Sequence, residues 1–319
     1  MEGLAGYLIP FVTFAGIYAV LSLGLNMQWG LTGLFNIGIV AFAGAGAYTS
    51  ALLTRNPSDI FLLGLGLPFP VGLLGAMLVA AILALFVGWI TIRLRADYLA
   101  IATIGIGEIV RLVLKNEGWL TNGVRGLDRI DRPIIPRGDY GSNLVYMIVV
   151  LLLVLAVYLL FERARRSPWG RVLRAVRDNE LTAMAAGKNV VSYRLQAFVL
   201  GAAVMGLAGA LWGHFVGFIS PEAFMPMQIT FLTWVMLIAG GSGNNKGAIL
   251  GAVVIWTIWS SSQILTGYLP NELATQAGAI RMLLVGVMLI LVLLYRSEGL
   301  LSEGHQREQD IRRQRESGG

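Results

Sequence analysis

The sequence predicts an all-α fold, a polytopic helical membrane protein with eight to ten transmembrane helices and some glycine-rich or broken segments. Of the 319 residues, 56% are hydrophobic and 13% are charged, whereas soluble domains carry about 25% charged residues. Several apolar runs exceed the roughly 18 residues that a helix needs to cross a hydrocarbon core of about 30 Å. The mean hydropathy of +0.71 agrees with this fold class.

The polar residues exclude several classes of function. The chain has no cysteine, which removes disulfides, cysteine metal sites and thiol catalysis. Its two histidines and scattered acids show neither metal-ligand spacing nor a nucleophile beside a base, so we expect no enzyme and no metal site. The net charge of +6 comes from basic residues beside apolar runs. We interpret it as positive-inside bias next to membrane lipid, not as nucleic-acid binding.

The apolar runs give the order of the spans. The first run lacks a basic n-region, so we expect a span and not a cleaved signal peptide. Two stretches leave the count open. Residues 61–92, interrupted by Pro68 and Pro70, form either a re-entrant piece plus a span or one span after a turn, and 228–239 favours a half-helix because it is too short to cross untilted. The other spans are expected at 4–26, 30–53, 97–114, 144–161, 195–218, 253–265 and 279–295.

The second expected span is unusually rich in glycine. Residues 30–53 contain Gly33, Gly38, Gly44 and Gly46, which predicts close packing or a local unwinding. Unwound backbone at membrane depth persists only where protein or a water-filled cavity surrounds it. Asn36, Gly38, Gly44 and Gly46 are therefore candidates for the substrate pathway, and tight packing alone is the alternative.

Glu108, Arg111 and His214 are ionisable residues well inside apolar runs. Glu108 and Arg111 stand three residues apart and so share a helix face. Such residues are costly in a membrane and usually face the bundle interior. They form either a pathway or gating pair, or a structural bridge between helices. We expect His214 to be a buried, hydrogen-bonded side chain.

Two sets of glycines recur at every fourth residue, the spacing of close helix crossings. One set precedes the external turn at 220–226, and the other accompanies Lys246 in GGSGNNKG. That lysine does not make a phosphate-binding loop, because Asn245 precedes it and Gly247 follows it. The other two lysines also fail, because Leu114 precedes Lys115 and Asn189 follows Lys188, so the chain has no such loop and, if it uses ATP, another subunit must bind it. We predict helix packing at Gly209, Gly213, Gly217, Gly243, Gly247 and Gly251.

The longest charged segment between apolar runs is the loop at residues 162–194, with eight basic and three acidic residues. Loops this basic stay on the cytoplasmic side of a membrane. Ser167-Pro168 and Asp178-Asn179 are typical of helix starts, and Gly187 is a typical helix stop. Two short helices here indicate a docking surface, and a solvated loop with incidental helicity remains the alternative.

Five blocks of the sequence resemble one family in the same order. GRVLRAVRDNELTAMAAGKNVVSYRLQAF at 170–198 resembles the cytoplasmic coupling loop of LivM-type permeases of branched-chain amino acid ABC importers. DYLAIATIGIGEIVRLVL at 97–114 is similar to that family's GxGExxR span. Further similar blocks are GLTGLFNIGIVAFAGAGAYTSALL, GGSGNNKGAILGA and LLYRSEGLL, so the resemblance extends to about residue 301.

The resemblance implies a permease domain at 1–301 and a polar cytoplasmic tail at 302–319. It implies a subunit of a bacterial inner-membrane importer that binds no cofactor itself, with ATP and Mg held by two cytoplasmic ATPases. A homologous LivH-type permease and a periplasmic or lipid-anchored binding protein would complete the complex. Residues 178–187 would form the coupling helix. Assigned to ATPase coupling are Asn179, Glu180 and Gly187, which match the family pattern, and Arg171, Arg174 and Arg177.

Alternatives remain open at this point. Many relatives carry a histidine where this chain reads NIGIV at 36–40, and related permeases transport urea, short amides or other amino acids. A secondary transporter that works alone would prefer a convincing inverted repeat with membrane-embedded acids. A membrane scaffold would leave the glycine-rich second span unexplained.

Overall fold

The computed structural model describes residues 2–56, 64–130, 140–266, 276–296 and 298–304. Nine long helices make up most of this part of the chain. They are α1 (Glu2–Leu25), α2 (Ile39–Thr54), α3 (Phe69–Thr91), α4 (Ala96–Asn116), α6 (Tyr140–Arg166), α9 (Val190–Val216), α10 (Pro226–Gly240), α11 (Asn245–Thr266) and α13 (Ala277–Tyr295). The short elements are η1 (Asn26–Gly30), α5 (Gly118–Thr121), η2 (Gly123–Arg125), α7 (Pro168–Asp178), α8 (Glu180–Ala185) and η3 (Pro221–Phe224).

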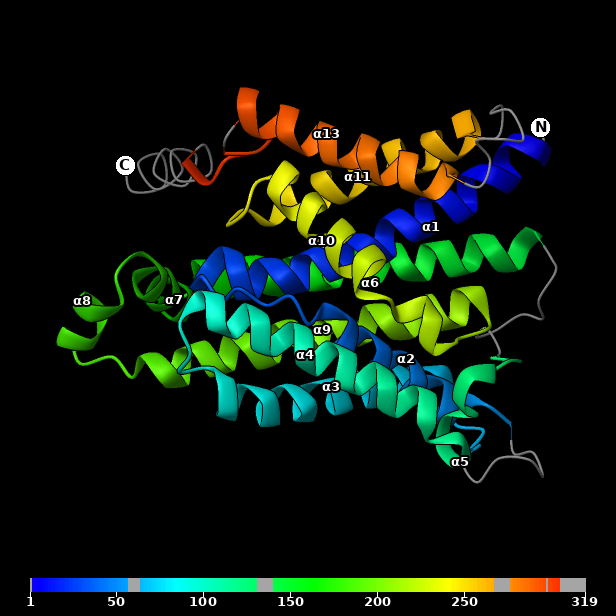
Figure 1. Cartoon of the computed structure of the whole chain (residues 1–319), viewed down its shortest axis with the longest axis horizontal. Coiled ribbons are helices and arrows are strands. Elements are labelled where there is room, and N and C mark those ends of the chain that lie inside the picture. Colours follow the sequence, from blue (N-terminus) through cyan, green and yellow to red (C-terminus); the bar gives the residue numbers. More distant parts are fainter. Residues whose placement is uncertain (1, 57–63, 131–139, 267–275, 297, 305–319) are drawn as a thin grey trace, which may run out of the picture.

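The long helices lie side by side in one bundle, as Figure 1 shows. Helices α7 and α8 project from one end, where the last described residues also lie, while α5 and the start of α1 lie at the other end. Six of the described helices are long and apolar enough to cross a membrane. They are Gly6–Gly30, Phe69–Thr91, Gly141–Arg166, Val190–Val216, Pro221–Gly240 and Gly278–Tyr295. With α2, α4 and α11 in the same bundle, the polytopic all-α class is confirmed.

Helix α9 forms the centre of the bundle, and small residues let its neighbours approach. Its side chains pack against α1, α2 and α3 in one continuous apolar core. The backbone of α9 at Gly206 lies against Gly46 of α2, so a Cβ on Gly46 would collide with it, and a Cβ on Gly206 would itself collide with Ala76 and Ala80 of α3. In contrast, α3, α6 and α13 turn large apolar side chains outward, including Trp89, Leu160 and Leu294. These helices form the outer surface of the bundle, which suits contact with lipid or partner helices.

Several predicted elements differ in detail from the structure. The second expected span is divided, since η1 and a non-helical segment at 33–38 precede α2. In the described part of 61–92 there is one helix, which begins at the Pro68–Pro70 pair as proline in the first turn allows. Helix α6 continues through Arg166 and α9 begins at Val190, so the charged segment predicted at 162–194 includes an end of each of these helices. The expected half-helix at 228–239 is the 15-residue α10, preceded by η3.

Some predictions fall outside the described residues. The sequence also predicts an external polar loop at 115–143, with Pro133 and Pro136, and an external turn through Pro270. Residues 131–139 of that loop, the turn at 267–275 and the tail from residue 305 onward lie outside the described residues. The expected elbow at 220–226 contains η3, and the segment before it is fixed by a bridge between Leu127 and Ile219. The two backbone hydrogen bonds of this bridge measure 2.8 and 2.9 Å.

Candidate functional site

The short helices α7 and α8 begin and end at the residues that the sequence marks. The Ser167 side chain accepts a hydrogen bond from the Gly170 N–H at 3.3 Å, and the Asn179 side chain accepts one from the Thr182 N–H at 3.0 Å. Gly187, with φ of +74°, follows the end of α8, and the Lys188 N–H donates to the Ala183 carbonyl at 3.1 Å. Because these caps satisfy the end groups of both helices, residues 167–188 form a defined structure, named here the coupling unit.

Helix α8 presents apolar side chains outward while the rest of it is held in place. Leu181 and Met184 are 77% and 54% exposed. Ala183 is buried and belongs to a small apolar cluster with α7, and Glu180 binds Arg194 of α9 at 2.9 Å. Large exposed apolar groups on a rigid surface helix are typical of a protein interaction site. Glu180 thus anchors α8 to the bundle, and the exposed side chains of Leu181 and Met184 are available to contact a partner protein.

The arginines assigned to coupling do not form one surface. Arg171 is exposed, whereas Arg177 donates to the Gly30 carbonyl at the end of η1. Arg177 also binds the Glu303 carboxylate at 2.9 Å, and Arg174 lies 3.9 Å from the same carboxylate. These contacts connect the last turn of α7 to the interior of the bundle and to the segment after α13.

The non-helical segment at 33–38 is held by side chains. The Asn36 amide donates to the Gln28 side chain at 2.7 Å and accepts from the Gly38 N–H at 2.8 Å. The Ile37 N–H donates to the Thr103 hydroxyl at 3.0 Å. Because buried backbone groups need such partners, this segment is a held break between η1 and α2. Of the two predicted alternatives, close packing or local unwinding, the structure has the unwinding here.

The glycines of the second span have different surroundings. Gly33 has a φ of +70°, which L-residues with side chains rarely adopt. Gly38 lies against the Thr103 carbonyl of α4, so a Cβ there would collide with backbone. Gly46 faces α9, while Gly44 has ordinary space, about 3.5 Å from a Cβ to Leu114 and Phe224. The structure thus brings Asn36 and Gly38 together in the break and places Gly44 and Gly46 within α2.

A buried polar cluster near the coupling unit was missed by the sequence analysis. Arg165 binds Glu162 at 2.7 Å, with side chains only 1% and 9% exposed. The Asn245 amide donates to Glu162 at 3.0 Å and accepts from the Asn26 amide at 2.9 Å. Asn26 also accepts from the Gly243 N–H at 2.8 Å. Asn26, at the end of the first expected span, was the sequence signal for this cluster, because a polar residue in an apolar run needs a partner.

Glu108 and Arg111 form an ion pair at the opposite end of the bundle from the coupling unit. Their atoms lie 2.5 Å apart, and Arg111 also reaches Glu222 of η3 at 3.4 Å. Lys115 binds the same Glu222 carboxylate at 2.9 Å. The pair therefore connects α4 to η3, as the bridge alternative predicted, and its pathway role stays a prediction. His214 is 1% exposed and lies 2.9 Å from the Ser50 hydroxyl, so its predicted burial is confirmed.

The six glycines predicted to pack helices fall into three groups. Gly209 lies against the Ala43 carbonyl of α2, and Gly247 and Gly251 lie against the backbone of α10. Gly213 has ordinary space, with 3.7 Å from a Cβ to the nearest atom. The other two differ from the prediction. Gly217, with φ of +75°, ends α9, and Gly243, with φ of +82°, lies in the turn before α11.

Comparison with known proteins gives the family. Residues 7–293 match the family model described as the permease component of branched-chain amino acid transport systems. The chain belongs to this family. It is 32% identical over 92% of its length to the high-affinity branched-chain amino acid permease protein LivM of Escherichia coli, covering 69% of that protein. It is 30% identical to the probable LivM of Methanocaldococcus jannaschii, over 90% of this chain and 91% of that one.

The second permease type of the family is also similar to this chain. LivH of Escherichia coli is 27% identical over 91% of this chain and 92% of its own length. No solved structure matches the chain. The family match includes the break at 33–38 and the coupling unit, so both belong to the part shared with other permease components.

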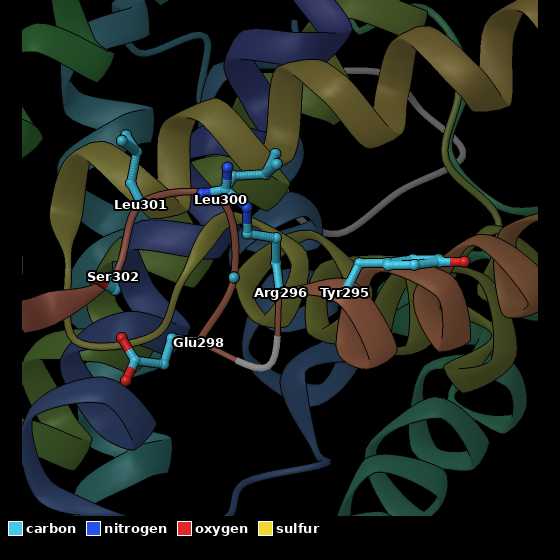
Figure 2. Close-up of a pocket in the computed structure, with 7 residues that line it drawn as sticks. Tyr295, Arg296, Glu298, Leu300, Leu301 and Ser302 are labelled. Atoms are coloured by element: carbon cyan, nitrogen blue, oxygen red, sulfur yellow. The ribbon is translucent and has the colours of Figure 1, made fainter.

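Residues 298–301, which lie beyond the part that matches the family model, form a turn that closes the end of α10. Leu300 and Leu301 donate their N–H groups to the carbonyls of Ala239 and Gly240 at 2.9 and 3.0 Å. Figure 2 shows this turn and the side chains around its hollow of about 390 Å³, with Tyr295 and Glu298 pointing away from each other. Glu303 follows directly and binds Arg177. In this permease component the residues around 302 thus contact the coupling unit, and the expected domain boundary there stays a prediction.

Proposed function

We propose that this chain is the membrane-spanning permease subunit of an ATP-driven importer for branched-chain or related amino acids in a bacterial inner membrane. The observation that carries the proposal is the similarity to LivM proteins over about nine-tenths of the chain, within a family of branched-chain amino acid permease components. The described helices supply the multi-pass membrane domain that such a subunit needs.

The proposed partners follow from the same comparison and from the coupling unit. The similarity to LivH, which is named as a permease of the same transport system, supports a LivH-type permease as the second membrane subunit. The exposed Leu181 and Met184 on α8 supply an apolar contact for a cytoplasmic ATPase. A periplasmic or lipid-anchored protein would deliver the amino acid, and two ATPases would bind ATP and Mg.

The geometry supports a route from the ATPases to the membrane domain. In the proposed mechanism, closure of the ATPases moves the coupling unit through α8. Arg177 in the last turn of α7 would pass this movement to Gly30, which lies next to the break at 33–38. Nucleotide drives transport only if it favours one of the outward-open and inward-open states over the other.

The test is gentle detergent purification of the tagged chain from its native cells, followed by uptake assays. We expect two ATPases and a homologous permease to co-elute, and leucine to compete for uptake better than urea or short amides. Competition by urea alone would move the chain to the amide branch of the family. Purification of the chain as a stable transporter without ATPases would contradict the proposal and favour a secondary transporter.

A further inference from the structure

A cavity of about 680 Å³ runs along one face of α10. One wall contains Pro226, Thr230, Trp234 and Ile238, which recur at every fourth residue of α10 and so lie on one side of that helix, and it continues to Ser242 in the turn that follows. The opposite wall includes residues of the break, among them Phe35. The cavity therefore follows α10 from its first turn past its last, along the direction in which a substrate would cross the bundle.

The walls of this cavity are apolar and aromatic. Trp29, Phe35 and Trp234 contact one another, with ring centroids 4.8 to 5.4 Å apart. The Trp234 ring N–H donates to the Asn36 carbonyl at 3.0 Å, which fixes α10 to the break. A volume within the usual range of about 300–1,000 Å³, with apolar walls and few polar groups, is typical of a small-molecule site.

Thr230 is the unusual polar residue of this wall. It is 3% exposed, and its hydroxyl has no hydrogen-bond partner among the described residues. Other buried helical threonines donate to the carbonyl four residues earlier, as Thr13, Thr91 and Thr233 do at 2.7 to 2.8 Å. A buried hydroxyl that forgoes this bond is unfavourable unless another group uses it. Thr230 thus places an unbonded hydroxyl in the wall of a mostly apolar cavity, whose other polar lining residue in the described part of the chain is Ser242.

We propose that this cavity is the part of the transport pathway that this chain contributes, and that it binds the aliphatic side chain of the transported amino acid. The Thr230 hydroxyl forms a hydrogen bond to the ammonium or carboxylate group of that amino acid. The cavity is partly open on one side, which the second permease closes. This assignment rests on the proposed function, because it takes an amino acid as the substrate.

The test uses the assembled importer, with its binding protein, in proteoliposomes loaded with ATP, and measures uptake of leucine and valine. Thr230→Val keeps the shape of the side chain and removes the hydroxyl, so we expect about threefold to tenfold lower uptake of both at low concentration. Thr230→Ser should restore most of it. The matched control is Thr233→Val on the same helix, whose hydroxyl is bonded to Ile229 and which does not line the cavity.

A second variant tests side-chain recognition. Ile238→Phe narrows the cavity, so the ratio of leucine to valine uptake should fall by about tenfold, because the larger substrate loses more room. Unchanged uptake and an unchanged ratio in both variants would overturn the assignment. Loss of the second permease from the purified Ile238→Phe complex would overturn it too, because a helix of that partner would then fill the cavity. If the wild-type importer takes up neither amino acid, the proposed function itself fails.

Discussion

At the scale of single residues, the buried pair of Glu162 and Arg165 shows how charge is placed near the end of α6. Sequence reasoning counts both among the charged residues of a solvated loop, yet their side chains are almost completely buried. Arg166 binds the same carboxylate at 2.9 Å but remains 47% exposed. The two arginines therefore differ in environment while sharing one partner.

This difference gives a prediction for stability. Glu162→Gln removes the carboxylate beside a buried guanidinium, and breaking such a pair costs about 3–5 kcal/mol. Arg166→Gln is the control, because an exposed pair contributes about 1 kcal/mol or less. We expect the midpoint of thermal unfolding in detergent to fall strongly for the first variant and little for the second. Equal midpoints would show that the pair does not stabilise the fold.

This region also shows which structural features could be predicted from the sequence and which could not. The caps at Ser167, Asn179 and Gly187 are local signals, so both short helices of the coupling unit could be predicted. Glu162 instead meets Asn245, 83 residues away, and Asn245 meets Asn26, 219 residues away. No local pattern pairs residues at such separations, so the polar cluster could be found only in the folded chain.

At the scale of elements, the crossing of α2 and α9 depends on missing side chains. A Cβ on Gly209 would collide with the Ala43 carbonyl, which belongs to a helix backbone and cannot rotate away. Gly213 lies one turn further along α9, and a Cβ there would meet only ordinary contacts at 3.7 Å or more. A spacing of four residues therefore does not by itself identify a close crossing. Gly217 and Gly243 have the same spacing, yet they lie at a helix end and in a turn and pack no helices together.

The crossing predicts opposite results for two similar substitutions. Gly209→Ala should lower the free energy of unfolding by about 1–3 kcal/mol, because α2 and α9 must separate. Gly213→Ala should leave it unchanged or raise it slightly, because alanine favours a helix over glycine by about 1 kcal/mol. Thermal unfolding of the two purified variants side by side measures this. A similar decrease in the free energy of unfolding for both variants would contradict this explanation, because the collision with the Ala43 carbonyl would then not be the cause.

Helix α8 supports a prediction about partner binding. Leu181→Asp places a charge where an apolar partner surface is expected, so the ATPases should no longer co-purify while the chain still inserts and folds. The matched control is Val191→Asp, a similar change at a residue 39% exposed in the first turn of α9, where an acid is tolerated. Retention of the ATPases by Leu181→Asp would contradict the docking role of α8.

At the scale of the whole molecule, the two ends of the bundle differ in chemistry. The coupling unit, the buried Glu162 cluster and Glu303 lie at one end, while α5 and the Glu222 ion pairs lie at the other. Basic residues gather in the coupling unit, and such loops remain in the cytoplasm. Together with the charge rule, the structure predicts an orientation for the described helices, with α4 running outward and α6 returning to the coupling unit.

This orientation can be tested directly because the chain has no cysteine. Gly118→Cys in α5 introduces a thiol where a Cβ meets open space, and Lys188→Cys introduces one at the exposed end of the coupling unit. A membrane-impermeant maleimide added to intact cells should label the first and not the second, because only α5 faces outward. After membrane disruption both should react. Labelling of Lys188→Cys in intact cells would invert the topology and remove the coupling unit from reach of cytoplasmic ATPases.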